Sequence, residues 1–364
     1  MRLVIDARFT RIGYHDGISR FGASLLEALA ARTEVTALIH DDRQREMLTP
    51  DADYVRVTAP THPAEPFIAR RLNALGADVV FSPMQVMGSW GRRYRLILTL
   101  HDLIYYRHPL PPRDQPAVVR AAWRAYHSAY WPQRLMLDRA DAVATISATT
   151  RALMEEHRLT RRPVAVLPNA PSSYPAAATY TGPGERDRTL LYMGSFMPYK
   201  NVETLVRAAG LLPDHELHLL SRITPERRAA LEREAPAGAR LIFHDGVSDA
   251  EYHRLLDRCT ALVTASRDEG FGIPVVEAMG RGVPVVASDI PIFREIGGDA
   301  VGFFPVNDAQ GLASRVRELA DPENCRARSA AGRAVAGRYS WDASADTLLE
   351  LARRLHAGEP APVG

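Results

Sequence analysis

The sequence predicts an α/β protein with two doubly wound domains, in each of which helices cover both faces of a parallel sheet. Three observations lead to this prediction. The chain has 364 residues, more than one ordinary hydrophobic core supports. Short apolar runs alternate with amphipathic stretches along the chain, as expected of strands buried on both faces. Residues 171–188, rich in Ala, Pro, Ser, Thr and Gly, interrupt this alternation and are predicted to be an interdomain linker.

The first half of the chain predicts a Rossmann-like domain at residues 1–170. Its expected strands are residues 3–5, 35–39, 55–57, 79–81, 96–100, 142–146 and 164–167. Amphipathic residues 19–31 predict a helix after the first strand, and residues 113–139 predict one long helical region.

The same alternation resumes after the linker and predicts a second Rossmann-like domain at residues 189–340. Its expected strands are residues 190–193, 217–220, 240–243, 261–264, 283–287 and 300–304. A last helix at residues 341–357 is expected to pack back on the first domain, and residues 358–364 are expected to be a disordered tail. Ligands of such sheets bind at the carboxyl ends of the strands, so we expect the two domains to face a cleft.

Composition excludes several classes of protein. The net charge is +2 and no dense basic tract stands out, so nucleic acid is not expected as a partner. Cys259 and Cys325 form neither a disulfide framework nor a metal-ligand cluster, which favours a reducing cytosol. We expect no signal peptide, because the N-terminus leads directly into a predicted strand, and the sequence has no apolar run of ~18 residues. We therefore expect a cytoplasmic protein, with any membrane contact made from the inner face.

Lys200 is the only lysine among 45 basic residues of the Lys and Arg type. It lies where an apolar strand passes through a loop into a helix that begins near Asn201. An ammonium group is a compact point charge, whereas guanidinium is a flat fork, so the two are not interchangeable at an oxyanion. The position predicts a phosphate-binding lysine, although a single lysine must fall somewhere.

A second set of residues follows the strand that ends near residue 264. Its loop contains Gly270 and Gly272, which let the backbone approach a ligand closely, and Pro274 suits the first turn of a helix. The free amides of Val275 and Val276 are then expected to face a diphosphate at the positive end of the helix dipole.

Two carboxylates accompany these glycines. Glu269 lies in the loop, and Glu277 is expected in the first turn of the helix. A carboxylate can accept two hydrogen bonds from the vicinal hydroxyls of a sugar. The alternative is that Glu277 only favours the helix start and that Glu269 is solvated.

The segment from Glu269 to Glu277 resembles the Glu-x7-Glu signature of retaining glycosyltransferases of family 4, which have the GT-B fold. Further stretches resemble motifs of the same family: residues 192–201, 243–251, 284–297, 98–103 and 168–169. The resemblance covers nearly the whole chain. It assigns the acceptor to the domain at residues 1–170 and the nucleotide-sugar donor to the domain at residues 189–340.

The resemblance also implies roles for particular residues. Glu277 should bind the ribose, Glu269 the transferred sugar, and Lys200 the diphosphate. His101, Lys200 and Glu269 are the implied catalytic residues. The implied donor-binding residues are Gly17, Ser195, Lys200, Val247, Glu269, Gly270, Phe271, Gly272, Val275, Val276 and Glu277.

One position departs from the family pattern. Similar enzymes often have an arginine where this chain has Ser195. Arg20 and Arg222 are candidates for the missing phosphate-binding cation, and helix amides are an alternative to both.

The resemblance implies a hexosyltransferase that needs neither a metal nor another cofactor. The donor would be a GDP-, UDP- or dTDP-sugar, and the acceptor a hydroxyl of a glycan, a lipid-linked molecule or a small molecule. The acceptor would attack from the leaving-group face, so the configuration at the anomeric carbon would be retained. Alternatives are a nucleotide-sugar epimerase on the same fold and a non-catalytic nucleotide-sugar-binding protein.

Residues 104–139 combine aromatic and basic side chains. They could contact anionic lipid headgroups, which would make this a peripheral membrane protein, or the aromatic rings could simply pack on the first domain. The nucleobase, the sugar, the acceptor and the oligomeric state are not determined by the sequence.

Overall fold

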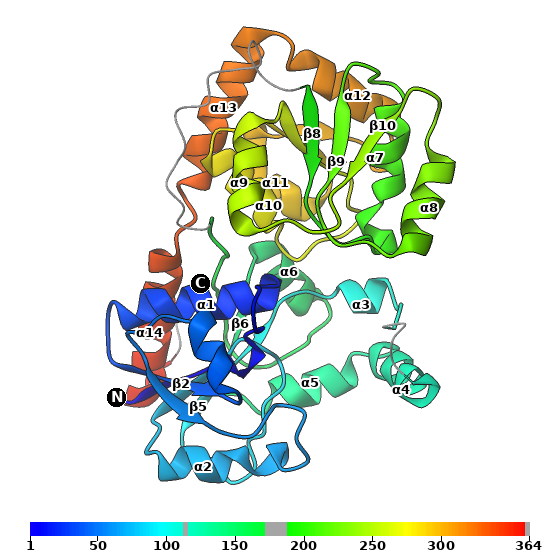
Figure 1. Cartoon of the computed structure of the whole chain (residues 1–364). Coiled ribbons are helices and arrows are strands. Elements are labelled where there is room, and N and C mark those ends of the chain that lie inside the picture. The colour runs from blue at the N-terminus through cyan, green and yellow to red at the C-terminus, as the bar shows by residue number, and fades with distance from the viewer. Residues whose placement is uncertain (112–115, 172–187, 361–364) are drawn as a thin grey trace. The chain divides into compact units, whose positions relative to one another are not determined.

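The computed structural model describes residues 1–111, 116–171 and 188–360 (Figure 1). All but the two ends of the expected linker lie outside the described residues, as do residues 361–364 of the expected tail. The chain divides into two compact units. The first unit comprises Met1–Asn169 together with the C-terminal segment from Ser340, and the second unit comprises Ala170–Tyr339.

The first unit contains a seven-stranded sheet in the order β3-β2-β1-β4-β5-β6-β7, and every neighbouring pair is parallel. Its strands are β1 (Leu3–Asp6), β2 (Val35–Ile39), β3 (Asp53–Arg56), β4 (Val79–Ser82), β5 (Arg95–Leu100), β6 (Ala142–Thr145) and β7 (Val164–Val166). The central strands are buried along their length, which explains why they appear in the sequence as continuous apolar runs.

The second unit contains a six-stranded parallel sheet in the order β10-β9-β8-β11-β12-β13. Its strands are β8 (Thr189–Tyr192), β9 (Glu216–Leu219), β10 (Arg240–Phe243), β11 (Ala261–Thr264), β12 (Val285–Ser288) and β13 (Gly302–Phe304). The two parallel sheets confirm the predicted fold class.

Helices connect the strands of both units. In the first unit they are η1 (Ala7–Phe9), α1 (Gly17–Ala30), η2 (Asp42–Met47), η3 (Glu65–Phe67), α2 (Ile68–Ala74), α3 (Ile104–Arg107), α4 (Ala117–His127), α5 (Trp131–Leu137), α6 (Ala148–Glu156) and α14 (Trp341–Ala357). In the second unit they are η5 (Pro198–Lys200), α7 (Val202–Ala209), α8 (Pro225–Glu234), α9 (Asp249–Arg258), α10 (Ile273–Gly280), α11 (Pro291–Gly297), η6 (Gly298–Ala300), α12 (Ala309–Glu318) and α13 (Pro322–Ala336).

The C-terminal helix α14 belongs to the first unit although it follows the second in sequence (Figure 1). The side chain of Ser340 caps its start by accepting from the amide of Ala343 at 3.0 Å. Arg32, just after α1, pairs with Asp342 and Asp346 of α14 at 2.8 and 2.6 Å. The two helices therefore pack against each other.

The long helical region expected at residues 113–139 is described from residue 116 on, since residues 113–115 lie outside the described residues. The structure has two separate helices there, α4 and α5, with a break at residues 128–130. Pro132 lies in the first turn of α5, where it needs no amide hydrogen. A proline has no amide hydrogen to donate to the carbonyl of Ser128, so the hydrogen-bond pattern of α4 cannot continue through residue 132 and a new helix starts instead.

Each sheet has a point where the strand order reverses. In the first unit, β1 lies between β2, which follows it in the chain, and β4, which comes later and pairs with its other side. In the second unit β8 has the same place, with β9 on one side and β11 on the other. The loops that follow the two central strands diverge at such a point and leave room for a ligand at the carboxyl edge of the sheet.

Candidate functional site

The predicted donor-site residues of the second unit lie at the carboxyl edge of its sheet. Because all six strands are parallel, the loops after β8, β9, β10 and β11 meet at this edge (Figure 1). Lys200 follows β8 and Glu269 follows β11, so the two residues flank the point where the strand order reverses.

Lys200 and Glu269 form an ion pair between the Nζ and Oε1 atoms. The side chains are 15% and 14% exposed, so the pair is largely shielded but still reached by solvent. Lys200 ends the short helix η5, and Asn201 then adopts the left-handed conformation with φ of 54°. The structure thus brings together two of the residues that the sequence singled out.

The loops that carry this ion pair are tied to each other. The backbone amide of Arg267 donates to the carbonyl of Tyr199 at 2.7 Å, and its guanidinium donates to the carbonyl of Pro198 at 2.7 Å. The side-chain amide of Asn201 donates to the carbonyl of Ala265 at 2.9 Å. The sequence prediction missed Arg267 and Asn201, although their positions beside the predicted site residues are a usable signal.

Two buried serines position the carboxylate of Glu269. The Oγ atom of Ser266 donates to Glu269 Oε1 at 3.2 Å. The Oγ atom of Ser288 in turn donates to the Ser266 carbonyl at 2.5 Å. Both serines are fully buried, so the Glu269 oxygen that faces Lys200 is held by the core of the sheet edge.

Gly272 precedes α10 with φ of 100°, a conformation that strongly favours glycine. A Cβ atom at this position would lie 2.9 Å from Cε1 of Phe293. The adjacent Gly270 and Phe271 are buried, and the Phe271 ring packs edge-on against Tyr339 at 5.5 Å. The loop before α10 is therefore fixed by close packing.

One detail of the predicted amide site is corrected by the structure. The amide of Val275 donates to the carbonyl of Gly272 at 2.9 Å, so it is not free for a ligand. The helix closes its first turn early, with a bond to the residue three positions before. Val276, also in this first part of α10, has a buried side chain.

Glu277 also differs from the prediction. It is not in the first turn but is the fifth of the eight residues of α10, because the helix begins at Ile273. At 3.6 residues per turn, Glu277 lies one turn beyond Ile273 on the same helix face. The residue is buried, at 6% exposure, which is uncommon for an acidic residue.

The turn after β8 is set by Tyr192. Its hydroxyl donates to the carbonyl of Ser195 at 2.6 Å, and a Cβ atom on Gly194 would lie 2.8 Å from that hydroxyl oxygen. The amide of Gly194 donates to Oγ of Ser221 at 3.2 Å, which joins the loops after β8 and β9. Ser195 itself is exposed at the sheet edge.

Arg222 lies beside the loop that follows β10. A Cβ atom on Gly246, which has φ of 104°, would be 3.0 Å from Cγ of Arg222. The amide of Gly246 donates to the carbonyl of Leu220 at 2.9 Å, and Val247 follows with a partly exposed side chain. The structure therefore brings Arg222 next to the Val247 loop.

In the first unit, Gly17 is the first residue of α1 and is exposed. The Asp16 side chain caps the helix by accepting from the amide of Ser19 at 2.9 Å. Arg20 lies in the same turn, with its amide donating to the carbonyl of Asp16 at 2.8 Å.

His101 follows β5 at the carboxyl edge of the first sheet. Its Nε2 atom lies 2.7 Å from the carbonyl oxygen of Pro83, after β4, and therefore donates to it. The ring packs edge-on against Phe21 of α1, with centroids 5.1 Å apart. Burial lowers the pKa of His101 below its usual value, so the neutral ring is favoured and Nδ1 is left as an acceptor.

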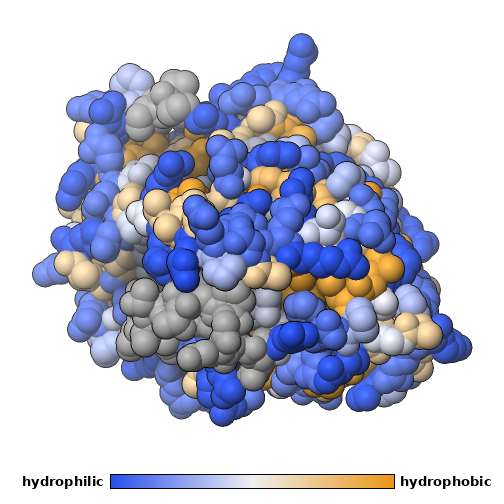
Figure 2. Space-filling model, turned by 90° about the horizontal axis from the view of Figure 1, so that it is seen from above, coloured by the Kyte–Doolittle hydropathy of each residue, from blue (hydrophilic) through white to orange (hydrophobic). Residues whose placement is uncertain are grey.

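Two properties of the described residues concern metals and membranes. No group of three or more His, Cys, Asp or Glu side chains has an arrangement suited to a metal ion in the described parts of the chain. Among the helices that the structure describes, none has the length and apolar character needed to cross a bilayer. The face shown in Figure 2 is mostly hydrophilic, with apolar areas broken up by polar residues.

Both units match models of known protein families. Residues 16–170 match the glycosyl transferase 4-like domain. Residues 180–335 match the glycosyl transferases group 1 domain. The two models together account for most of the first unit and most of the second.

Two similar proteins are named as O-antigen chain mannosyltransferases. The chain is 26% identical over 271 residues to the O-antigen chain mannosyltransferase B of Escherichia coli. This match covers 69% of this chain and 68% of the relative. The chain is 23% identical over 322 residues to the O-antigen chain mannosyltransferase RfbU of Salmonella typhimurium. That match covers 83% of this chain and 87% of the relative.

The fold is shared with solved structures. A sucrose-phosphate synthase from Thermosynechococcus elongatus superposes with a TM-score of 0.75 at 21% identity, covering 99% of this chain and 100% of that one. From the two domain models and this shared architecture, the chain belongs to the glycosyltransferases with a 4-like and a group 1 domain, and its fold is GT-B.

Proposed function

We propose that this glycosyltransferase moves a hexosyl unit from a nucleotide diphosphate sugar to an acceptor hydroxyl, with retention of configuration. One observation carries the proposal: the Lys200–Glu269 ion pair at the point where the second sheet reverses its strand order. A cation and a carboxylate held side by side match the two ends of a sugar diphosphate, one anionic and one rich in hydroxyls.

In this proposal, donor binding replaces the ion pair. Lys200 leaves Glu269 and neutralises the diphosphate, and the carboxylate becomes available to accept from hydroxyls of the sugar. The serine contacts of Glu269 keep it in place during this exchange. The charge that develops on the leaving diphosphate is then stabilised by Lys200 and by the N-terminal end of α10. Arg222 is a further candidate cation, since it lies beside the Val247 loop.

The remaining donor contacts follow from position. Glu277 would accept from the ribose hydroxyls, for which a buried carboxylate is well suited. Ser195, Phe271, Gly272 and Val276 would contribute backbone groups. Val275 would line the site rather than donate, because its amide is already used.

In the first unit, Gly17, Arg20 and His101 are proposed to serve the reacting end of the donor. In the transfer step, a bond forms between the acceptor oxygen and the anomeric carbon while the bond to the diphosphate oxygen breaks. A phosphate oxygen of the leaving group takes the acceptor's proton. No metal ion takes part in this step, and neutral His101 would orient a hydroxyl through Nδ1.

The experiment is a turnover assay with a panel of GDP-, UDP- and dTDP-sugars. Mannose is the first sugar to test, because both curated relatives are named mannosyltransferases. We expect one donor to be preferred, the product to keep the donor's anomeric configuration by NMR, and activity to survive chelation with EDTA. An inverted product, or full loss of activity in EDTA that a divalent ion restores, would refute the mechanism. Conversion of the donor without any acceptor would favour an epimerase.

The exposed apolar and basic side chains of α4 support a membrane-associated acceptor. None of its residues is buried, and Val118 and Val119 are 81% and 46% exposed. Arg120 and Arg124 lie on the same helix, and Trp131 in α5 is 62% exposed. We propose that this surface contacts an anionic bilayer. Wild-type protein should float with phosphatidylglycerol vesicles and V118D should not. Equal flotation of both would refute this contact.

A further inference from the structure

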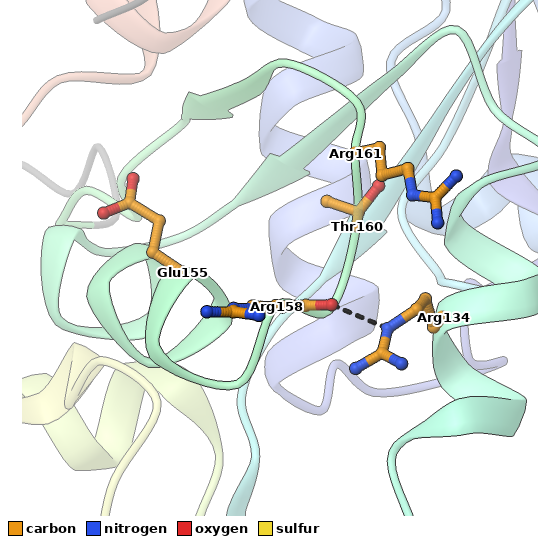
Figure 3. Close-up of a pocket in the computed structure, with 5 residues that line it drawn as sticks. All are labelled: Arg134, Glu155, Arg158, Thr160 and Arg161. Atoms are coloured by element: carbon orange, nitrogen blue, oxygen red, sulfur yellow. Dashed lines mark hydrogen bonds between the residues drawn. The ribbon is translucent and has the colours of Figure 1, made fainter.

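A cavity of about 710 Å³ lies in the first unit, and none of its lining residues belongs to the proposed donor or reaction site. Arg134, Glu155, Arg158, Thr160 and Arg161 line it (Figure 3). These residues come from α5, from the end of α6, and from the segment between α6 and β7. Three of the five carry a guanidinium group.

The cavity is at the opposite edge of the sheet from His101. The chain leaves the carboxyl end of β6, runs through the nine residues of α6, and reaches this segment just before β7 begins. Nine helical residues span about 13 Å. The cavity is therefore distinct from the proposed reaction site.

The segment at residues 157–162 is held in place before any ligand arrives. Arg134 donates from Nε to the Arg158 carbonyl at 2.7 Å, as Figure 3 shows, and from a terminal nitrogen to the His157 carbonyl at 3.1 Å. Asp138 accepts from the Thr160 hydroxyl and from the Arg161 amide, both at 2.9 Å. The side chains along this segment thus project from a fixed backbone.

Arg158 occupies a backbone position that usually belongs to glycine. Its φ is 47°, in the left-handed region. The amide of Arg158 donates to the Glu155 carbonyl at 3.0 Å, and that of Leu159 to the Met154 carbonyl at 2.8 Å. These are the two bonds of a helix C-terminal motif whose left-handed residue is most often glycine. A side chain there costs about 1 kcal/mol or more, which indicates a role for the one present.

The positive charge of the cavity is not neutralised. Within the described residues, the guanidinium groups of Arg158 and Arg161 make no ion pair, and both residues are exposed. Of the described residues that line the cavity, Glu155 alone has a carboxylate, and that group lies 3.9 Å from Arg151. In the view of Figure 3, the Arg134 and Arg161 guanidinium groups lie on one side of the segment, and the Arg158 side chain extends to the other side. Cationic residues therefore line the cavity from two directions.

We propose that this cavity binds a phosphate-type anion through Arg158 and Arg161, with Arg134 shaping the site. Guanidinium groups match phosphate oxygens in charge and in planar geometry. The phosphate can belong to a soluble ligand or to a lipid headgroup, and the chemistry of recognition is the same for both.

The test uses the double variant R158G/R161A. Glycine is the residue that best fits the backbone at position 158, so the variant removes charge without loss of folding, which a melting curve checks. R353A is the control, because Arg353 is an exposed arginine of the same unit with no described partner. All proteins carry Lys200→Ala, so that the proposed donor site does not add to the signal.

In the soluble arm, inorganic pyrophosphate is titrated into each protein by calorimetry. In the lipid arm, each protein is floated with phosphatidylcholine vesicles with and without phosphatidic acid. In one arm, we expect the affinity of the double variant to be at least about tenfold lower than that of the Lys200→Ala parent. The affinity of R353A should equal that of the parent. Loss in the first arm identifies a soluble phosphate ligand, and loss only in the second a lipid headgroup. If the double variant matches R353A in both arms, the proposal is wrong.

Discussion

The two sheets end in charged clusters at equivalent places, and the clusters differ in one respect that decides their roles. At the reversal point of the first sheet, Arg8 lies between Asp6 and Glu65, with side-chain exposures of 0%, 0% and 15%. At the reversal point of the second sheet, Lys200 has one carboxylate partner among the described residues, Glu269.

The difference lies in how many hydrogen-bond donors remain for a ligand. Arg8 donates twice to Asp6, twice to Glu65 and once to the carbonyl of Thr58, which uses all five of its N–H groups. Lys200 has three donors and a single carboxylate partner among the described residues. The first cluster is therefore structural, whereas the second can exchange its carboxylate for a phosphate. The comparison shows that a buried cation at a sheet edge indicates a ligand only when its donors are not all used.

Replacement of Arg8 tests the structural half of this comparison and should have the largest effect. Arg8→Ala leaves Asp6 and Glu65 next to each other without a counter-charge, and removing one partner of a buried pair costs about 3–5 kcal/mol. We expect a fall of that size in the free energy of unfolding, measured by urea denaturation. A change below about 1 kcal/mol would contradict the structural role.

Replacement of Lys200 tests the functional half. Lys200→Ala should lower kcat/KM by ~10²–10³, or ~3–4 kcal/mol of lost charge stabilisation in the transition state. Its effect on unfolding should be much smaller than that of Arg8→Ala, because this pair is partly exposed and can be solvated. Near-normal turnover of the variant would remove Lys200 from the mechanism.

Glu277→Ala sharpens the comparison within the second unit. The variant removes a proposed ribose contact but not the diphosphate contact, so we expect nucleoside diphosphate affinity to fall about tenfold by calorimetry. Glu323→Ala, at an exposed acid in the first turn of α13, is the control. Equal affinities for the two variants would contradict the ribose assignment.

The smallest expected effect is a pH dependence in the first unit. Burial lowers the pKa of His101, so the unfolded chain binds this proton more tightly than the folded chain does. The stability contribution is fully present above the unfolded pKa of about 6.5 and is lost as the pH falls below it. His101→Gln should flatten this part of the stability profile in melting experiments between roughly pH 5 and 7.5. An unchanged profile would show that His101 titrates normally.

Most of the secondary structure could be predicted from the sequence, and part of the site could not. Apolar runs such as those of β2 and β11 are local signals, and the strands appear where these runs occur. The sequence predicts a helical region at residues 113–139, and α4 and α5 lie within it, but periodicity alone does not locate the break at residues 128–130. The prediction that Glu277 lies in the first turn of its helix was wrong. Helix boundaries depend on caps and packing, here on the fit of Gly272 against Phe293.

The sequence by itself determined two parallel sheets, the lysine after β8 and the two acids around α10, because residue type and spacing are written along the chain. Only the tertiary structure decided which charges meet. Lys200 and Glu269 are 69 residues apart, and Arg8 and Glu65 are 57 apart. Such pairs form where strand order brings distant loops to one sheet edge, and whether a cation keeps a donor for a ligand depends on contacts that local periodicity does not encode.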